Sequence, residues 1–386
     1  MKIGIDARCF AQGKRTGVEE YAQKLLEAIF RNDPHNEYVL FFNALRHKNS
    51  DFSWATIFPH VSVVSFAIPN KFLNLSLWLL QYPKIDRLCG GVDLFFMPNS
   101  NFISLSRDVP LVLTVHDLSF AHYKRTFSYK RRLWHYFVNP RKLVARATHI
   151  MAVSAYTKED LCKTYGKKKE MVAVSLNGTT SIKGLLNRND IELIDVKRKY
   201  NLPYNFILYF GTIEPRKNIV GLVRAYEIFR KKNPHITPHL VLAGSRGWNM
   251  HTIEYAIASS CFSADIHVIT DIPEEDKEAF YALATVFVYP SFFEGFGFPP
   301  LEAALCKKPI IMSHTTSMPE VVEEGVIMID PYRTEELVAA LHAVFTQKEF
   351  TQYSEKSNTA TLRHKFSWDR NARDFLRVCY GGGGST

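Results

Sequence analysis

The chain lacks the cysteine pattern of a disulfide framework or a zinc site. It has six cysteines that are scattered and form no Cys-x-x-Cys pair: Cys9, Cys89, Cys162, Cys261, Cys306 and Cys379. Scattered single cysteines are typical of a reducing compartment. We therefore expect a cytoplasmic protein whose thiols stay reduced.

Long hydrophobic runs are also missing. No apolar stretch reaches the roughly 18 residues that a membrane-spanning helix needs. The first residues, Met1–Asp6, resemble a buried strand and lack the apolar core of a signal peptide. The closing Gly-Gly-Gly-Gly-Ser-Thr, residues 381–386, resembles a linker or tag remnant.

The length and the charge distribution favour two domains. A chain of 386 residues exceeds what one hydrophobic core usually supports. Residues 1–200 hold 30 Lys and Arg against 17 Asp and Glu, whereas residues 201–386 hold 18 against 21. This asymmetry indicates two domains with different partners, although a charge accident would give the same net figure of +10.

Buried strands alternate with amphipathic helices along nearly the whole chain. The expected strands are Lys2–Ala7, Tyr38–Phe42, Val61–Ala67, Asp93–Pro98, Leu111–Val115, His149–Val153, Met171–Leu176, Phe206–Gly211, His239–Ala243, Ile266–Thr270, Val286–Tyr289, Pro309–Met312 and Val326–Ile329. The expected helices include Val18–Phe30, Ile219–Lys231 and Thr334–Thr346. This alternation predicts parallel sheets wound by right-handed crossovers.

The pattern divides into two doubly wound, Rossmann-like α/β units. We expect an acceptor-binding domain over residues 1–190, a nucleotide-sugar-binding domain over 191–365, and a helix over 366–380 that packs back on the first domain. Ligands of such sheets bind beyond the carboxyl ends of the strands. Two sheets that face each other would place the site in a cleft between them.

The most informative motif follows the expected strand Val286–Tyr289. It contains Glu294, Gly295, Phe296, Gly297 and Glu302, and a helix is expected to open near Pro299. The glycines let backbone amides approach an anion, and the helix start adds partial positive charge. A carboxylate can accept hydrogen bonds from two adjacent sugar hydroxyls. The motif therefore predicts a site for a sugar attached to a diphosphate.

A second motif, Gly211–Asn218, follows the expected strand Phe206–Gly211. It places Arg216 and Lys217 together at the start of a helix. Arginine can bind two phosphate oxygens at once and lysine is a compact charge, so the pair predicts a clamp for a diphosphate leaving group. A solvated basic turn is the alternative.

Together these motifs resemble the retaining GT-B glycosyltransferases of the family-four group. The signature of that group is two glutamates seven residues apart around a Gly-x-Gly loop. The resemblance implies that Glu294 contacts the donor hexose and Glu302 the nucleotide ribose. Relatives often carry arginine directly after the glycine where this chain has Thr212, which favours Lys217 over Arg216 as a catalytic residue.

The front half supplies two further motifs of this family. In similar enzymes a histidine in the position of His116 hydrogen-bonds the donor hexose; a histidine satisfied by local backbone is the alternative. Asp117 either orients its loop or faces the acceptor. The loop Gly13–Val18 resembles the family's front-domain glycine loop, which assigns Thr16 and Gly17 to donor binding.

The segment Tyr123–Arg146 combines basic and aromatic residues, and no acidic residue lies between Leu118 and Lys158. Such a segment fits an anionic membrane surface or a phosphorylated acceptor. Lys71–Tyr82 adds apolar residues suited to docking. The alternative is a pair of core-facing helices with a solvated basic face. Nucleic acid would leave the glutamate motif unexplained, so we expect no nucleic-acid partner.

The resemblance implies a metal-independent, retaining hexosyltransferase that uses GDP-mannose or a UDP-hexose and needs no cofactor. No Asp-x-Asp string that would hold a metal occurs in the chain. The acceptor is expected to be a saccharide or lipid-linked saccharide in cell-surface polysaccharide or glycolipid synthesis. A nucleotide-sugar epimerase, a pyridoxal-phosphate phosphorylase and a non-catalytic sugar- or lipid-binding subunit are the alternatives. Glu294→Ala and Lys217→Ala are expected to abolish turnover and leave the melting temperature nearly unchanged.

Overall fold

The computed structural model describes the chain apart from residues 13–16, 46–50, 180–189, 348–357 and 382–386. The described residues form two compact units. Unit 1 comprises Met1–Phe120, Tyr129–Gly178 and the C-terminal segment from Phe366. Unit 2 comprises Ala121–Ser128 and Thr179–Lys365. The expected α/β class is confirmed, because each unit is built on one parallel sheet.

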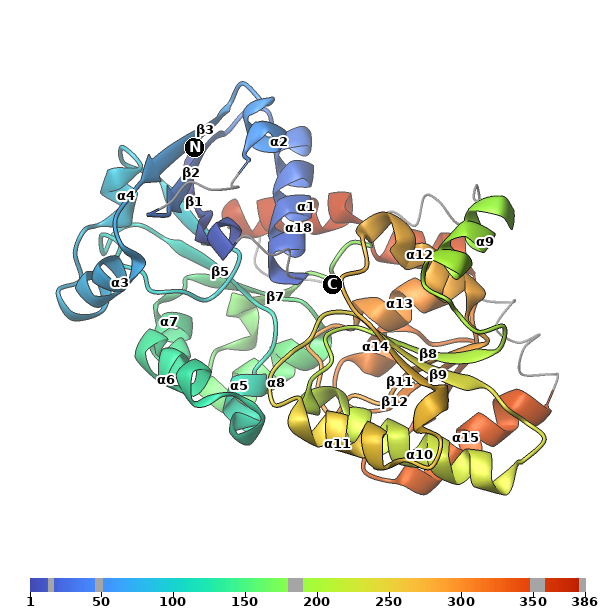
Figure 1. Ribbon diagram of the computed structural model, residues 1–386. Helices are drawn as coiled ribbons and strands as arrows, with labels where there is room; N and C mark the ends of the chain where they lie inside the picture. The colour runs from blue at the N-terminus through green and yellow to red at the C-terminus, as the bar shows by residue number, and fades with distance from the viewer. Residues whose placement is uncertain (13–16, 46–50, 180–189, 348–357, 382–386) are drawn as a thin grey trace. The chain divides into compact units, whose positions relative to one another are not determined.

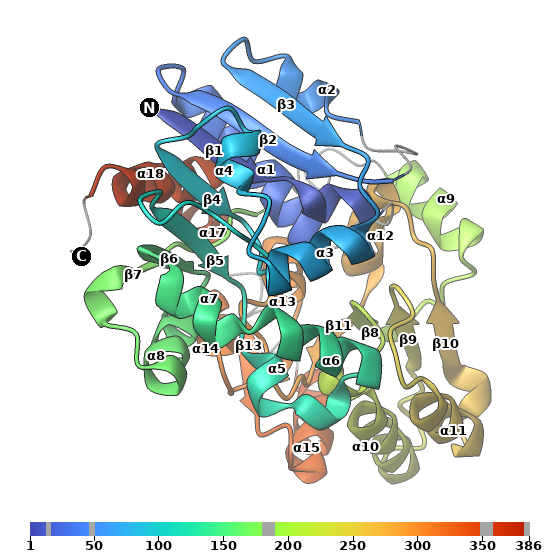
Figure 2. The same ribbon diagram turned by 90° about the vertical axis from the view of Figure 1, so that its left-hand side faces the viewer.

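Unit 1 contains a seven-stranded sheet in the order β3-β2-β1-β4-β5-β6-β7. Its strands are β1 (Lys2–Asp6), β2 (Glu37–Asn43), β3 (Val61–Phe66), β4 (Leu94–Met97), β5 (Leu111–Val115), β6 (His149–Ala152) and β7 (Val172–Val174). Figure 2 shows these strands side by side with helices on both faces. The central strands β1, β4 and β5 are almost wholly buried, as continuous apolar runs in a parallel sheet require.

The helices of unit 1 connect these strands. They are η1 (Arg8–Gln12), α1 (Gly17–Asn32), α2 (Ser53–Thr56), α3 (Asn70–Leu79), α4 (Ile85–Leu88), α5 (Ser119–His122, which ends in unit 2), α6 (Tyr129–Val138), α7 (Pro140–Arg146), α8 (Ala155–Tyr165), η3 (Lys169–Met171) and α18 (Trp368–Cys379).

The last helix, α18, belongs to unit 1 and packs against α1, which it crosses in Figure 1. The Phe375 ring packs against Phe96 of β4 at a centroid distance of 4.6 Å. The side-chain amide of Asn371 donates to the Leu176 carbonyl at 2.8 Å. The apolar face of this amphipathic helix thus covers the sheet that the first half of the chain builds.

Unit 2 contains a six-stranded parallel sheet in the order β10-β9-β8-β11-β12-β13. Its strands are β8 (Phe206–Phe210), β9 (His239–Ala243), β10 (Ile266–Ile269), β11 (Val286–Tyr289), β12 (Ile310–Ser313) and β13 (Val326–Ile329). Its helices are η2 (Lys124–Thr126), α9 (Asp190–Lys199), η4 (Pro215–Lys217), α10 (Ile219–Lys232), α11 (His251–Ser259), η5 (Ser263–Asp265), α12 (Glu274–Leu283), α13 (Phe298–Leu305), α14 (Met318–Val321), α15 (Thr334–Thr346) and α17 (Thr359–Lys365).

The unit boundaries differ from the sequence-based ones in two places. The chain passes from unit 1 to unit 2 at Gly178, before the expected residue 190. The short segment Ala121–Ser128 belongs to unit 2, although the sequence analysis assigned it to the first domain. Aromatic contacts explain this exception: Tyr123 packs on Phe293 at 5.4 Å between centroids, and Phe127 stacks on Trp248 at 5.6 Å.

No helix in the described part of the chain is long and apolar enough to cross a membrane.

Candidate active site

The site of unit 2 lies at the carboxyl ends of β8 and β11, which are neighbours in the sheet. After β8 the chain turns at Gly211, whose φ of +149° favours glycine. The loop then forms the short helix η4, and Asn218 in the left-handed conformation leads into α10. This local geometry presents Arg216 and Lys217 just beyond the end of the strand, where parallel sheets bind ligands.

After β11 a second loop leads into α13. Gly297 has a φ of +116°, and α13 begins at Phe298 with prolines in its first turn, as predicted. The two loops are joined by a hydrogen bond from the backbone amide of Phe292 to the Arg216 carbonyl at 3.0 Å. Residues far apart in the sequence therefore form one rigid cluster.

Glu294 is the centre of that cluster. Its Oε1 accepts hydrogen bonds from Lys217 Nζ and, at 2.6 Å, from Ser291 Oγ. Its Oε2 accepts from Arg216 NH1 at 3.0 Å. Arg216 also donates to Glu214 at 3.0 Å. The two predicted cations and the predicted sugar-binding glutamate thus lie together, and Glu214 balances the remaining charge.

Burial makes these charges strongly interdependent. Glu294 and Lys217 are each 7% exposed. Burial raises the pKa of Glu294, but the charges of Arg216 and Lys217 and two side-chain hydrogen bonds outweigh it and lower that pKa to about 2. Burial and the neighbouring Arg216 lower the pKa of Lys217, and the carboxylate of Glu294 opposes that change. Glu294 is consequently an anion at any physiological pH.

The remaining hydrogen-bonding capacity of Glu294 is small. A carboxylate has about four lone-pair positions. Lys217 and Ser291 occupy two on Oε1, and Arg216 occupies one on Oε2. The Tyr289 hydroxyl also hydrogen-bonds this carboxylate, so a sugar hydroxyl that binds Glu294 has to share or replace one of these contacts.

The second glutamate of the motif, Glu302, is held differently. Lys277 Nζ donates to its Oε1 at 2.5 Å and Tyr281 Oη to its Oε2 at 2.6 Å. Both partners lie on α12, one helical turn apart. Each oxygen of Glu302 keeps one acceptor position, which matches two adjacent hydroxyls such as those of a ribose.

Unit 1 places His116 directly after β5. Its Nε2 lies 2.9 Å from the Pro98 carbonyl and donates to it. The Tyr21 ring packs edge-on against the imidazole at 4.7 Å, and Tyr21 Oη is 3.2 Å from Thr114 Oγ1. Burial lowers the pKa of His116, so the neutral ring keeps Nδ1 as an acceptor. Nε2 is therefore satisfied by local backbone, which was the alternative expectation for His116. Nδ1 can still accept a hydrogen bond from a hydroxyl.

The structure describes Asp117 and Gly17, two further predicted residues of unit 1, but it does not describe Thr16. Asp117 Oδ1 accepts hydrogen bonds from the Ser119 amide at 2.9 Å and the Ser119 hydroxyl at 2.6 Å. Asp117 therefore orients its own loop, which is one of its two expected roles. Gly17 is exposed at the first position of α1. Thr16 lies outside the described residues.

No cluster of three or more histidine, cysteine, aspartate or glutamate side chains able to hold a metal occurs among the residues that the structure describes.

The sequence analysis missed several participants of these clusters, among them Tyr21, Lys277 and Tyr281. Each reaches its partner through the tertiary fold, so no local motif marks it. The one available signal was the i, i+4 spacing of Lys277 and Tyr281, which places both on one face once the segment forms the helix α12.

The structure has two parallel α/β units, and in unit 2 two cations and a Gly-x-Gly loop lie at the carboxyl ends of the strands, as expected of a glycosyltransferase with this fold. Comparison with known families agrees: residues 190–360 match the family "Glycosyl transferases group 1" and residues 15–180 match "Glycosyltransferase Family 4". O-antigen chain mannosyltransferase B of Escherichia coli is 30% identical over 275 residues, which is 70% of each chain. The chain therefore belongs to the GT-B glycosyltransferases of the family-four group.

A longer relative and two solved structures extend the comparison. The serotype-specific mannosyltransferase WbdA of Escherichia coli is 27% identical over 263 residues, which cover 68% of this chain and 32% of WbdA. The fold matches Anabaena HepE in complex with UDP and glucose (TM-score 0.72, 17% identity, 99% and 100% of the two chains). It also matches WaaG, a glycosyltransferase of lipopolysaccharide biosynthesis (TM-score 0.72, 13% identity, 98% and 100% covered).

Proposed function

We propose that this glycosyltransferase transfers mannose from GDP-mannose, with retention and without a metal, to a saccharide hydroxyl in the synthesis of a cell-surface polysaccharide. The buried cluster of Arg216, Lys217 and Glu294 carries the proposal. It combines two cations suited to a diphosphate with a carboxylate suited to a hexose, at the strand ends where this fold binds ligands.

The choice of mannose rests on the relatives. O-antigen chain mannosyltransferase B and WbdA are both mannosyltransferases, and the name of the first refers to a polysaccharide chain, the O-antigen. A UDP-hexose is the second candidate, because HepE was solved in complex with UDP-glucose. We assign the diphosphate to Arg216, Lys217 and the amides of Gly295–Gly297, the ribose to Glu302, and the hexose to Glu294.

The proposed reaction breaks the bond between the anomeric carbon and the leaving phosphate oxygen and forms a bond from that carbon to the acceptor oxygen. The acceptor proton passes to the leaving phosphate on the same face, which preserves the anomeric configuration. Arg216 and Lys217 stabilise the charge that develops on the diphosphate. His116 and the donor-binding loop that begins α1 at Gly17 complete the donor contacts, as the family resemblance implies.

We further propose that the enzyme works in the cytoplasm at an anionic membrane surface. Two observations support this location. All six cysteines are free thiols, as a reducing compartment requires. Helices α6 and α7 carry six Lys and Arg and no Asp or Glu over Tyr129–Arg146, and Tyr129 and Tyr136 are each 77% exposed. Aromatic and basic side chains together favour an anionic interface.

The test is to incubate the protein with GDP-mannose or UDP-glucose, with and without a mannose-terminated oligosaccharide, and to follow nucleoside diphosphate release. We expect acceptor-dependent GDP release that persists in EDTA and a product with the donor's anomeric configuration by NMR. Sugar conversion without acceptor would support an epimerase instead. Loss of turnover in EDTA would contradict metal independence.

A further inference from the structure

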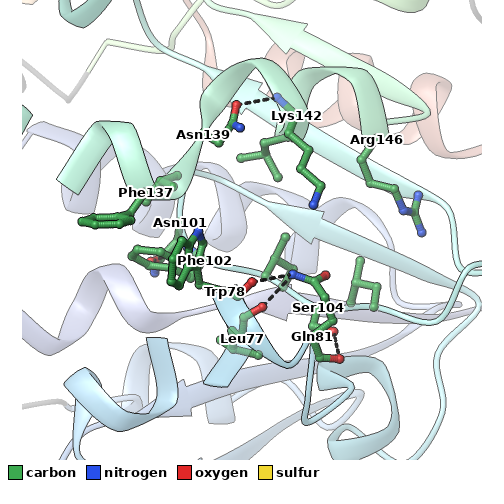
Figure 3. A pocket seen from close by; sticks show the side chains of 14 residues that line it. Leu77, Trp78, Gln81, Asn101, Phe102, Ser104, Phe137, Asn139, Lys142 and Arg146 are labelled. Carbon is green, nitrogen blue, oxygen red and sulfur yellow. Dashed lines mark hydrogen bonds between the residues drawn. The ribbon is translucent and has the colours of Figure 1, made fainter. Parts of the chain in front are cut away.

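Unit 1 contains a pocket of about 220 Å³ between α3, the loop after β4 and the helices α6 and α7. Figure 3 shows the side chains that line it. They are Leu77, Trp78, Gln81, Asn101, Phe102, Ile103, Ser104, Leu105, Phe137, Val138, Asn139, Lys142, Leu143 and Arg146. None of them belongs to the donor-binding cluster described above.

The walls of the pocket are apolar and well packed. Trp78 of α3 meets Phe137 of α6 edge-on, with 5.1 Å between the ring centroids. Leu77, Leu105 and Leu143 are all buried beside them. The pocket is thus a preformed, largely apolar recess between the three helices α3, α6 and α7, as small-molecule sites commonly are.

The polar part of the lining is positively charged. Lys142 points into the pocket in Figure 3, and its Nζ forms no hydrogen bond or ion pair within the described part of the chain. Arg146 donates to the carbonyls of Ser106 and Val109 at 3.0 and 2.7 Å, which fixes its guanidinium in the wall. The lining contains no Asp or Glu. The chemistry of the recess therefore favours an anion attached to an apolar body.

Two of the helices that line the pocket also carry exposed apolar side chains outside it. On α3, Phe72, Leu75 and Leu79 are 70%, 54% and 63% exposed. On α6, Tyr129 and Leu133 are 77% and 42% exposed and lie one helical turn apart. Such side chains on one face, beside basic ones, are typical of surfaces that enter the headgroup region of a membrane. A neutral saccharide would leave both the charge of Lys142 and this apolar surface without a role.

We propose that the pocket binds the phosphate-bearing headgroup of an anionic glycerophospholipid, with Lys142 on the phosphate and α3 in the apolar layer. The inference deepens the proposed membrane association by assigning one lipid site to it. A bound lipid would hold unit 1 against the surface on which a lipid-linked acceptor is presented.

The experiment is co-sedimentation of the full chain with vesicles of phosphatidylcholine alone or with added phosphatidylglycerol. Lys142→Gln is compared with Lys163→Gln; both lysines are exposed, but Lys163 lies on α8 of the same unit and does not line the pocket. Removal of a lysine that lies near an anionic surface without contacting a lipid directly weakens vesicle binding about fivefold. We expect Lys142→Gln to weaken binding to the anionic vesicles at least ~10-fold, as a direct charge-assisted contact requires, and Lys163→Gln to weaken it less than about fivefold.

A double variant, Leu75→Ser with Leu79→Ser, should release the protein from anionic vesicles even at low salt. GDP-mannose binding, followed by thermal shift, should be the same in all these variants, so loss of the lipid site is distinguishable from loss of the proposed function. Equal effects of Lys142→Gln and Lys163→Gln would overturn the proposal. So would binding of manno-oligosaccharide that Lys142→Gln abolishes.

Discussion

The buried contact between Lys217 and Glu294 determines what substitutions there will do. Removing one partner of a buried ion pair leaves an uncompensated charge in the interior. The expectation that single alanine variants leave the melting temperature nearly unchanged therefore does not fit this geometry, because both side chains are 7% exposed. The sequence could not reveal this, since Glu294 lies far from Lys217 along the chain.

We predict that Lys217→Ala and Glu294→Ala each lower the free energy of unfolding by about 3–5 kcal/mol and abolish turnover. The double variant Lys217→Met, Glu294→Leu should lose less stability than the sum of the two single variants, yet remain inactive. Urea denaturation measures the stabilities. The exposed pair Lys231 and Glu227 is the control, and its variants should change stability by at most about 1 kcal/mol. Additive single effects at positions 217 and 294 would contradict the account.

The lowered pKa of Glu294 predicts a specific loss of stability in acid. A carboxyl group whose pKa falls from 4.5 to about 2 on folding stabilises the protein above pH 4.5, and this stabilisation is lost as the pH falls toward 2. The contribution is on the order of 3 kcal/mol. Wild type should lose more stability between pH 6 and pH 3 than Glu294→Gln does, as measured by urea unfolding. Parallel pH profiles would show that Glu294 is not an ion-paired carboxylate.

Glu302 should act on donor affinity and have little effect on the chemical step. Its assigned contact is to the ribose, away from the anomeric carbon. A hydrogen bond to a charged group contributes about 1.5–3 kcal/mol, so Glu302→Gln should raise the donor KM roughly 10- to 100-fold with kcat little changed. Steady-state kinetics with varied donor measures both. A fall in kcat at unchanged KM would contradict the ribose assignment.

At the scale of elements, Gly297 and Gly17 lie at the starts of α13 and α1, but the fold constrains the two positions differently. Gly297 has a φ of +116°, and an added Cβ would lie 3.0 Å from Met318 Sδ. Gly17, at the first position of α1, has no positive φ, and no atom of the described residues lies within 4 Å of an added Cβ. The fold requires glycine at position 297, whereas only a ligand would require it at position 17.

Gly297→Ala should therefore lower the free energy of unfolding by about 1–3 kcal/mol and also impair turnover. Gly17→Ala should leave stability unchanged or raise it by up to ~1 kcal/mol, because alanine favours the helix. It should lower turnover, because the added methyl group would crowd a bound donor. Thermal unfolding and activity together separate the two effects. Full activity of Gly17→Ala would remove Gly17 from the donor site.

The order of elements was largely predictable from the sequence. All thirteen expected strands are present, because continuous apolar runs such as Leu111–Val115 have only one way to be buried in an α/β unit. The motif glycines and prolines also predicted where α13 begins. Side-chain partners such as Tyr21 for His116 and Lys277 for Glu302 were not predictable, because they depend on which elements the fold brings together. The sequence analysis placed Ala121–Ser128 in the first domain for the same reason, since its membership of unit 2 depends on tertiary contacts.

At the scale of the whole molecule, the family and the site support one claim: Arg216 and Lys217 bind the diphosphate of a sugar nucleotide. A ligand that binds only the folded protein stabilises it by mass action, by about 2.7 kcal/mol at one hundred times its Kd. GDP should give this stabilisation, and guanosine, which lacks the diphosphate, should not.

The most direct test is calorimetric titration of GDP into wild type, Arg216→Gln and the control Arg246→Gln, an exposed arginine of the same unit. We predict that wild type and Arg246→Gln bind GDP equally and that Arg216→Gln weakens binding at least ~10-fold, the loss of one charge-assisted contact. Unchanged GDP affinity in Arg216→Gln, or equal affinity of wild type for guanosine and GDP, would contradict the claim.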